Sequence, residues 1–420
     1  MRIKNIHIEN FKGIDNNDIY FNKNFNVLIG ENGAGKTSVL DAVSIAIGTI
    51  LMKSGASFGY SGTRTRPLYK HEIRSIITEL GKNEPQEVTL EGNFDYQGNI
   101  LNWCRRQPRF SKNLSYKEAS DVTGLGEYFL ENIENPIDLP LFVHHTTARL
   151  WGNIFATKAK YQKQNSRFEG YYACLDSRSI KDKFVGWFKT YEDKILKFEE
   201  DKSLYNAFTS AITSMVKDWE RIHYSWDQED ILGKTSNGNW LPLKNLSDGY
   251  RGMVHLTADL AYRAIQLNPH LGERAVLDTE GIVLIDEIDM HLHPKWQRHI
   301  IDDLKRTFPK IQFIVTTHSP FIVQSLKADE VINLDGKLLA EDPNVLTFEE
   351  NALFMGVSDS NSEKFERKEK FATEYLKSLN VHNPSQEALD KLDELLIEFS
   401  DDPAFVAKLK LEKLIKLGKQ

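Results

Sequence analysis

The chain has 420 residues, of which 40% are hydrophobic and 11% aromatic, enough to bury a sizeable core and to build two or three structural units. Sixty acidic residues against 53 basic ones give a formal charge of -7, so the overall field does not attract nucleic acid, and DNA binding is possible only through a local patch. No run approaches the roughly 18 apolar residues of a membrane helix, and the first ten residues lack the apolar stretch of a signal peptide. We therefore expect a cytoplasmic protein without a membrane partner.

The N-terminal part predicts a strand, a glycine loop and a helix that follow one another. Residues 3–10 alternate as in a half-buried strand, 25–29 form an apolar run that ends in glycine, and 38–51 show the apolar spacing of a helix. Further along, 88–102 has the pattern of a hairpin that turns at Gln97-Gly98-Asn99. We expect this hairpin to form an antiparallel flank on the main sheet.

The middle of the chain predicts a helical insertion and then a parallel sheet. Residues 151–230 are charged and rich in aromatic residues, with helical segments such as 184–200 and few strand signals. Apolar strands at 281–285 and 311–315 are separated by a helical pattern at 296–307. This strand, helix, strand order is typical of a parallel sheet.

After about residue 346 the strand patterns cease, and the chain predicts a helical tail with helices at 385–399 and 403–417. The whole pattern indicates an α/β fold, with strands in both the N-terminal and the C-terminal part of the chain. We expect the divisions 1–150 for the N-terminal lobe, 151–230 for the helical insertion, 231–345 for the C-terminal lobe, and 346–420 for the tail.

The clearest motif is a glycine-rich phosphate loop between the strand at 25–29 and the helix after it. Backbone amides of such a turn wrap phosphates at the helix N-terminus, the lysine reaches the terminal phosphates, and the threonine hydroxyl can ligate Mg²⁺. The loop therefore predicts binding of ATP with Mg²⁺. Its residues are Gly30, Glu31, Asn32, Gly33, Ala34, Gly35, Lys36 and Thr37, followed by Ser38.

Two acids directly follow the strand at 281–285. We expect Asp286 to hold Mg²⁺ together with Thr37, and Glu287 to polarise the attacking water. Taken alone, the pair fits a buried strand that ends in two surface acids equally well. A phosphate loop in the same chain favours a Walker B element.

Two more motifs indicate contacts with phosphate. His318 follows the strand at 311–315, where it can contact a γ-phosphate from the strand end. Ser247 and Gly249 precede a helical stretch and can offer a hydroxyl and an amide at its start. Without the other motifs, Ser247 would be interpreted as a helix cap.

In this order the four motifs resemble those of the ABC/SMC-type ATPases: Walker A at 30–37, the signature loop at 246–250, Walker B at 281–287, and the switch histidine at 318. The resemblance implies a P-loop ATPase head with a mixed sheet and an antiparallel flank. It also implies that the signature loop of one head contacts the γ-phosphate held by another, so that ATP drives formation of a homodimer or higher homo-oligomer. This chain reads LSDGY where the family commonly has LSGGQ, and no glutamine is assigned to the Q-loop.

Within that group, the run 286–297 followed by TTHSP is similar to the RecF-like and overcoming-lysogenization-defect branch. The stretches 139–143, 147–151 and 402–406 resemble compact bacterial ATPases of anti-phage systems, the Septu ATPases and their retron-associated relatives. This resemblance implies control of a separately encoded effector nuclease of the HNH type. The segment 151–230 is too short for long coiled-coil arms, and no nuclease motif is recognisable after His318.

Two alternatives to the anti-phage ATPase stay open. The first is a RecF-like DNA-repair clamp that binds DNA directly. The second is a nucleotide-dependent assembly scaffold with little hydrolysis. An HNH nuclease gene beside this one favours defence, repair genes favour the clamp, and turnover of the purified protein separates the scaffold.

Overall fold

The computed structural model describes residues 1–53, 68–77, 83–109, 111, 115–147, 167–175, 181–198, 201–337, 339, 341–356, and single positions or short runs between 370 and 414. The chain divides into two compact units, Met1–Gly356 and Val357–Gln420. The helix predicted at 385–399 lies outside the described residues, and the described positions between 406 and 414 are helical.

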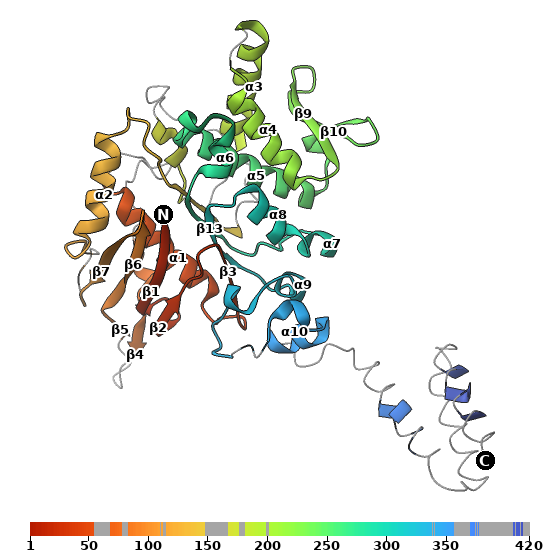
Figure 1. The fold of residues 1–420 in the computed structure, drawn as a ribbon. Coiled ribbons are helices and arrows are strands. Elements are labelled where there is room, and N and C mark those ends of the chain that lie inside the picture. Colours follow the sequence, from red (N-terminus) through yellow and green to blue (C-terminus); the bar gives the residue numbers. More distant parts are fainter. Residues whose placement is uncertain are drawn as a thin grey trace. The chain divides into compact units, whose positions relative to one another are not determined.

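The centre of the first unit is a five-stranded parallel sheet in the order β14-β3-β13-β12-β8 (Figure 1). β3, β12 and β13 are buried along their whole length, as parallel strands covered on both faces are. Because all five strands are parallel, their carboxyl ends meet at one edge. The strands are β3 (Phe25–Ile29), β8 (Leu141–His145), β12 (Gly281–Ile285), β13 (Ile311–Thr316) and β14 (Val331–Asn333).

A second, antiparallel sheet has the order β2-β1-β6-β7. The predicted hairpin is confirmed, since β6 and β7 are joined by Gln97 and Gly98, both with positive φ (52° and 84°) as a tight primed turn requires. The parallel and antiparallel strands thus belong to separate sheets rather than to one mixed sheet. The strands are β1 (Arg2–Phe11), β2 (Ile14–Tyr20), β6 (Val88–Tyr96) and β7 (Asn99–Gln107), and a short pair lies beside them, β4 (Ser75–Ile77) and β5 (Asn83–Pro85).

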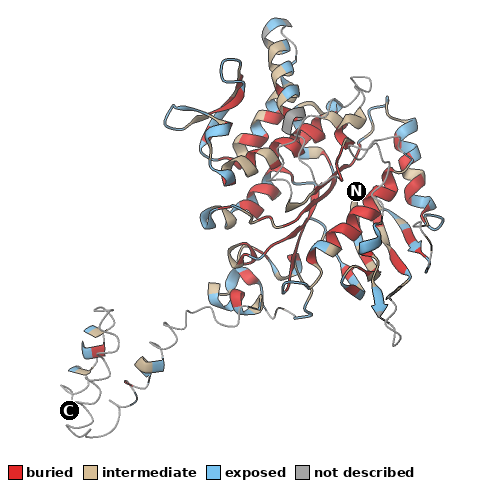
Figure 2. Ribbon diagram, turned by 180° about the vertical axis from the view of Figure 1, so that it is seen from behind, coloured by how far each residue is buried: buried red, intermediate tan, exposed pale blue. Residues whose placement is uncertain are grey.

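The helix α1 (Lys36–Leu51) contacts both of these sheets. It touches β1 and β6 of the antiparallel sheet and β8, β12 and β13 of the parallel sheet. A helix between two sheets is covered on all sides, which explains why every residue from Val39 to Leu51 is buried, the polar Asp41, Ser44 and Thr49 included. In Figure 2 this helix and the central strands are coloured as buried. The phosphate loop before α1 is therefore fixed to a rigid core.

The middle of the chain adds helices and a small three-stranded antiparallel sheet in the order β11-β10-β9. The range 151–230, predicted to be helical, holds α3 and α4 but ends in the strand β9, which pairs with β10. The helical prediction is wrong for these last residues, which pair with β10 as an antiparallel strand and bury Trp219, Ile222 and Tyr224. The elements are α2 (Ser120–Glu131), α3 (Lys181–Phe198), α4 (Ser203–Met215), β9 (Trp219–Ser225), β10 (Asp230–Thr235) and β11 (Trp240–Pro242).

The remaining helices of the first unit follow β11. The helix predicted at 296–307 is interrupted, because His299 leaves helical geometry (φ -121°) between α7 and α8. The helices are α5 (Asp248–Leu267), α6 (Ala275–Asp278), α7 (Pro294–Gln297), α8 (Ile300–Thr307), α9 (Pro320–Val323) and α10 (Phe348–Phe354). Short 3-10 turns, among them η3 (Arg167–Tyr171), η4 (Leu243–Asn245) and η5 (Pro269–Arg274), connect the elements.

The predicted boundaries at 150, 230 and 345 stay predictions. The helix α10 lies beyond residue 345 and belongs to the compact unit that ends at Gly356.

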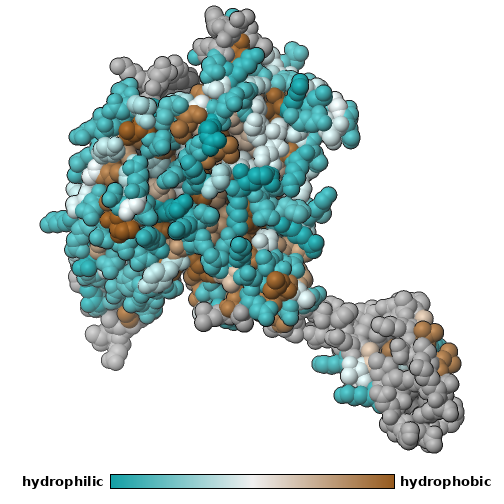
Figure 3. Space-filling model, viewed as in Figure 1, coloured by the Kyte–Doolittle hydropathy of each residue, from teal (hydrophilic) through white to brown (hydrophobic). Residues whose placement is uncertain are grey.

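On the face of this unit shown in Figure 3, hydrophilic residues predominate and hydrophobic ones are scattered. Among the described helices, none is long and apolar enough to cross a membrane.

Candidate functional site

The phosphate loop lies between β3 and α1, as predicted. Gly30, Gly33 and Gly35 have φ values of 148°, 94° and 95°, a region that side chains disfavour and glycine adopts freely. Gly35 is the N-cap of α1, so the amides of the first helical turn point toward the loop. The loop thus has the geometry of an anion-binding helix start.

Lys36 is buried at the start of α1, and its ammonium lies within the loop. Its Nζ donates to the carbonyl oxygens of Gly30 (2.7 Å) and Glu31 (3.0 Å). Burial lowers the pKa of Lys36, while the carboxylates of Asp335, Asp286 and Glu287 oppose this effect. The charged lysine is therefore held where a bound anion would neutralise it.

Asp286 follows β12 and faces Thr37 across the sheet edge. The Thr37 hydroxyl donates to both Asp286 oxygens, at 3.2 and 3.1 Å, and the Thr316 hydroxyl donates to Oδ1 at 2.6 Å. The backbone N–H of Asp286 donates to the carbonyl of His145 (2.8 Å). One hydroxyl and one carboxylate side by side are hard oxygen donors, the kind that Mg²⁺ prefers, and Mg²⁺ commonly takes its other ligands from phosphate and water.

Glu287 has φ 49°, which is unusual for a residue with a long side chain. Its N–H donates to the Thr316 hydroxyl (2.7 Å), so Thr316 contacts both acids of the motif. Strained backbone of this kind occurs preferentially at functional sites.

His318 is exposed and lies just beyond β13, the strand between β3 and β12. Asp289 orders the backbone there, since its Oδ1 accepts the Thr317 hydroxyl (2.5 Å) and the His318 N–H (3.4 Å). Since β13 separates the strand of the phosphate loop from that of Asp286, His318 follows a strand end between the two motifs. The structure thus brings the phosphate loop, Asp286, Glu287 and His318 to one sheet edge.

The signature loop, 246–250, begins α5. Ser247 is the exposed N-cap and makes no capping hydrogen bond, whereas Gly249 is buried against the carbonyl oxygen of His291. Asp248, the acid that replaces a family glycine, forms an ion pair with Arg251 one turn along α5. Its negative charge is thereby offset locally by Arg251.

A hollow of about 440 Å³ adjoins the signature loop. Tyr250 forms one wall, donating to Asp218 (2.7 Å) and meeting the Trp296 ring edge-on. The described lining residues include Ser247 and Gly249 but none from the phosphate loop, and neither Asp286, Glu287 nor His318. Within one chain, this hollow therefore adjoins the signature loop and not the phosphate loop. The remaining lining residues come from 215–218, 253 and 291–303.

His145, at the end of β8, was not identified from the sequence. It pairs with Ile285 in register, and its Nε2 lies 3.2 Å from Oδ2 of Asp259 on α5. Burial alone would raise the pKa of Asp259, but the Arg263 guanidinium, also buried, and His145 together hold that pKa below its usual value. Through its contact with Asp259, His145 links the strand beside Asp286 to α5, the helix that carries the signature loop.

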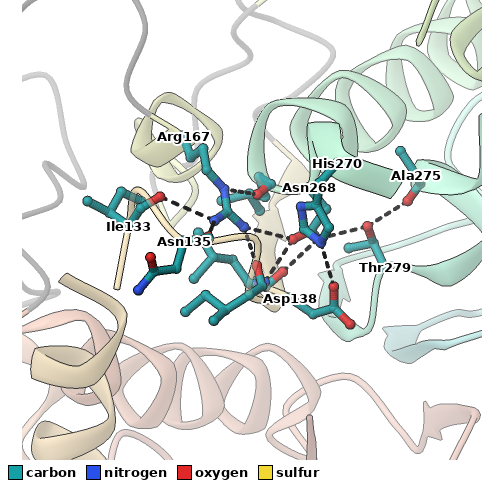
Figure 4. A network of polar contacts seen from close by, with 11 residues as sticks. Ile133, Asn135, Asp138, Arg167, Asn268, His270, Ala275 and Thr279 are labelled. Atoms are coloured by element: carbon teal, nitrogen blue, oxygen red, sulfur yellow. Dashed lines mark hydrogen bonds and ion pairs between the residues drawn. The ribbon is translucent and has the colours of Figure 1, made fainter. Parts of the chain in front are cut away.

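A second, partly buried network fastens the other end of that helix (Figure 4). Arg167 donates to the carbonyl oxygens of Leu267 (2.6 Å) and Asn135 (2.6 Å) and to Asn268 Oδ1 (3.3 Å). Asn268 in turn bonds the backbone N–H and carbonyl of Leu139 at 2.8 and 2.9 Å. The entry into β8 and the end of α5 are thus tied together.

A model of the AAA domain family matches residues 5–230, and a second model, described as an AAA domain, putative AbiEii toxin, Type IV TA system, matches residues 163–324. The chain is similar to the retron Vc95 probable ATPase of Vibrio cholerae, with 24% identity over 84% of this chain and 77% of that protein. It is also similar to the Septu protein PtuA of Bacillus thuringiensis, with 26% identity over 94% of each chain. The predicted resemblance to Septu and retron-associated ATPases is thereby confirmed.

Among solved structures, the chain is similar to the SMC head domain from Thermotoga maritima. The match covers 79% of this chain and 94% of that chain, with 16% sequence identity and a TM-score of 0.42.

Proposed function

The chain belongs to the AAA domain family, and from this premise we propose that it binds and hydrolyses ATP with Mg²⁺ as part of a bacterial anti-phage system. In this proposal the phosphate loop holds ATP, Thr37 and Asp286 hold Mg²⁺, and Glu287 polarises the attacking water. The observation that carries it is the contact of the Thr37 hydroxyl with both oxygens of Asp286, at 3.2 and 3.1 Å, from motifs far apart in sequence.

The chemistry proposed for these residues follows from their positions. Lys36 neutralises the β and γ phosphates, which lowers the energy of the charge that develops on them. Mg²⁺ would supply further charge neutralisation between the phosphates. Glu287 accepts the proton of the attacking water, and His318, from the neighbouring strand end, contacts the γ-phosphate.

We also propose that two copies of the chain complete each other's sites. Two features support this: the signature loop faces a hollow separate from the phosphate loop, and its N-cap Ser247 is exposed without a capping bond. A helix start with free amides can then receive the γ-phosphate held by a second copy. ATP bound between two heads stabilises the closed pair and shifts the population toward it.

The partner in this proposal is a separately encoded effector nuclease of the HNH type, gated by closure of the heads. The similarity to a Septu protein and to a retron ATPase supports the assignment to defence. The genes beside this one test it: an HNH nuclease gene is expected, and a cluster of DNA-repair genes would instead favour a repair clamp.

Release of phosphate from ATP by the purified protein tests the proposed reaction. We expect turnover that requires Mg²⁺ and is lost in Glu287→Gln. Asp289→Asn is unsuitable as a control because Asp289 orders the backbone before His318. Glu349→Gln, an exposed acid on α10, is a better one and should keep the wild-type rate.

A further inference from the structure

The turn after β14 lies against the beginning of the phosphate loop. β14 pairs with β3 up to Asn333, which lies opposite Ile29, and the Leu334 N–H then donates to the carbonyl of Ile29 (3.0 Å). The Asp335 N–H donates to Asn333 Oδ1 (2.8 Å), and Gly336 has φ 76°. These bonds fix the position of Asp335 relative to the end of β3, where the phosphate loop starts.

The Asp335 side chain reaches the first two residues of that loop. Its Oδ2 accepts the backbone N–H of Glu31 (2.9 Å). Both carboxylate oxygens lie 3.2 Å from the place that a Cβ on Gly30 would occupy. A hydrogen bond to an ionised acceptor is stronger than one between neutral groups. Asp335 therefore holds the backbone at Glu31 from outside the loop.

Glu31 is the residue around which the rest of the loop is arranged. Its carbonyl oxygen accepts the Ala34 N–H (3.1 Å) and the Lys36 ammonium (3.0 Å). A displacement of the Glu31 backbone would thus move the loop closure at Ala34 and one of the two carbonyl groups that hold Lys36. The Asp335 carboxylate also attracts the Lys36 ammonium and so favours its charged form.

We propose that Asp335 is a positioning residue for nucleotide binding, which holds Glu31 so that Lys36 is presented to the phosphates from a fixed place. The inference rests on the proposed function, because it requires that the loop binds ATP. Asp335 lies about 300 positions from the loop in sequence (335 against 31) and belongs to none of the four motifs, so nothing in the sequence pattern assigns it this role.

The test is calorimetric titration of the full chain with ATP and Mg²⁺. Asp335→Ala removes the acceptor of the Glu31 N–H, and we expect its Kd to rise about tenfold, the factor typical of a lost hydrogen bond to a charged group. Asp335→Asn keeps an oxygen acceptor but no charge, and we expect its Kd to stay within about threefold of wild type. Glu341→Gln, which removes an exposed carboxylate beyond the turn, serves as the control for charge and should bind as wild type does.

Thermal unfolding of each variant separates binding from folding, and Asp335→Asn remains informative if Asp335→Ala unfolds. Rescue by Asn, with unchanged unfolding temperatures, supports a positioning role that a merely structural residue would not show. Wild-type affinity in Asp335→Ala would overturn the inference, as would equal weakening in both variants or tighter binding in either. If wild type itself does not bind ATP, the proposed function fails, which is a different result.

Discussion

Gly249 of the signature loop packs directly on the backbone of His291, where a Cβ on residue 249 would come within 2.6 Å of the His291 carbonyl oxygen. His291 lies in the loop that follows Asp286 and Glu287, and it has φ 61°. The start of α5 and the segment after the two acids are therefore in contact through rigid backbone, with no flexible side chain between them. A change in one segment must move the other.

That contact predicts that the substitution Gly249→Ala impairs hydrolysis. The added methyl group cannot fit without displacing the His291 backbone, so we expect ATP turnover to fall by about tenfold or more, since displacement of a site by about 1 Å has effects of this order or larger. ATP binding to one head, measured by calorimetry, should change little. Gly124→Ala on α2, where an added Cβ meets nothing within 4 Å, is the matched control. Wild-type turnover in Gly249→Ala would show that the contact is not needed.

Lys36→Ala and Glu287→Gln should have different effects. Removal of the Lys36 ammonium takes away the charge opposite the phosphates, so we expect no measurable ATP binding. Glu287→Gln leaves the phosphate loop intact, so binding should persist while hydrolysis stops. Calorimetry and phosphate release on the same preparations distinguish the two, and equal ATP affinity in Lys36→Ala and wild type would refute the phosphate loop.

Thr316→Val tests the hydroxyl that contacts both acids. Valine has nearly the same shape but cannot donate to Asp286 or accept the Glu287 N–H, so each acid loses one hydrogen bond. We expect kcat to fall about 10- to 100-fold, the usual effect of removing a residue that orients a metal ligand. Thr257→Val is the matched control. Thr257 is also a buried threonine, on α5, and its replacement should leave kcat unchanged. An unchanged kcat in Thr316→Val would show that the Thr316 hydroxyl is not needed for hydrolysis.

Some residues of the candidate site could be predicted from the sequence, and others could not. The phosphate loop, Asp286, Glu287 and His318 are recognisable because each stands next to a strand whose pattern is local. Thr316, His145 and Asp335 gain their roles only from the strand order β14-β3-β13-β12-β8, which brings together residues far apart in the chain. β9 was missed because it follows a long helical stretch, and its burial depends on pairing with β10. Tertiary context of this kind decides strand pairing more than propensity does.

The buried Asp259 predicts a pH dependence of stability. Its pKa is below the usual value in the folded state, so its contribution is complete above the unfolded pKa, about 3.9, and is lost as the pH falls through the lower folded value. Asp259→Asn should destabilise the protein by about 3 kcal/mol at pH 7, because the charge of Arg263 stays buried without its carboxylate partner and keeps only two carbonyl oxygens as acceptors. Urea unfolding should show a smaller difference at about pH 3 than at about pH 5. A difference that grows as the pH falls below about 5 would contradict the lowered pKa.

The central claim, that ATP joins two heads through the signature loop, is tested most directly by sedimentation velocity of Glu287→Gln with ATP and Mg²⁺. This variant should bind ATP without consuming it, and its heads should associate beyond the state seen without nucleotide. Adding Ser247→Arg, which places a bulky side chain at the exposed start of α5, should prevent that association while ATP binding persists. Unchanged sedimentation of Glu287→Gln with saturating ATP, or ATP-driven association that Ser247→Arg does not affect, would contradict the account.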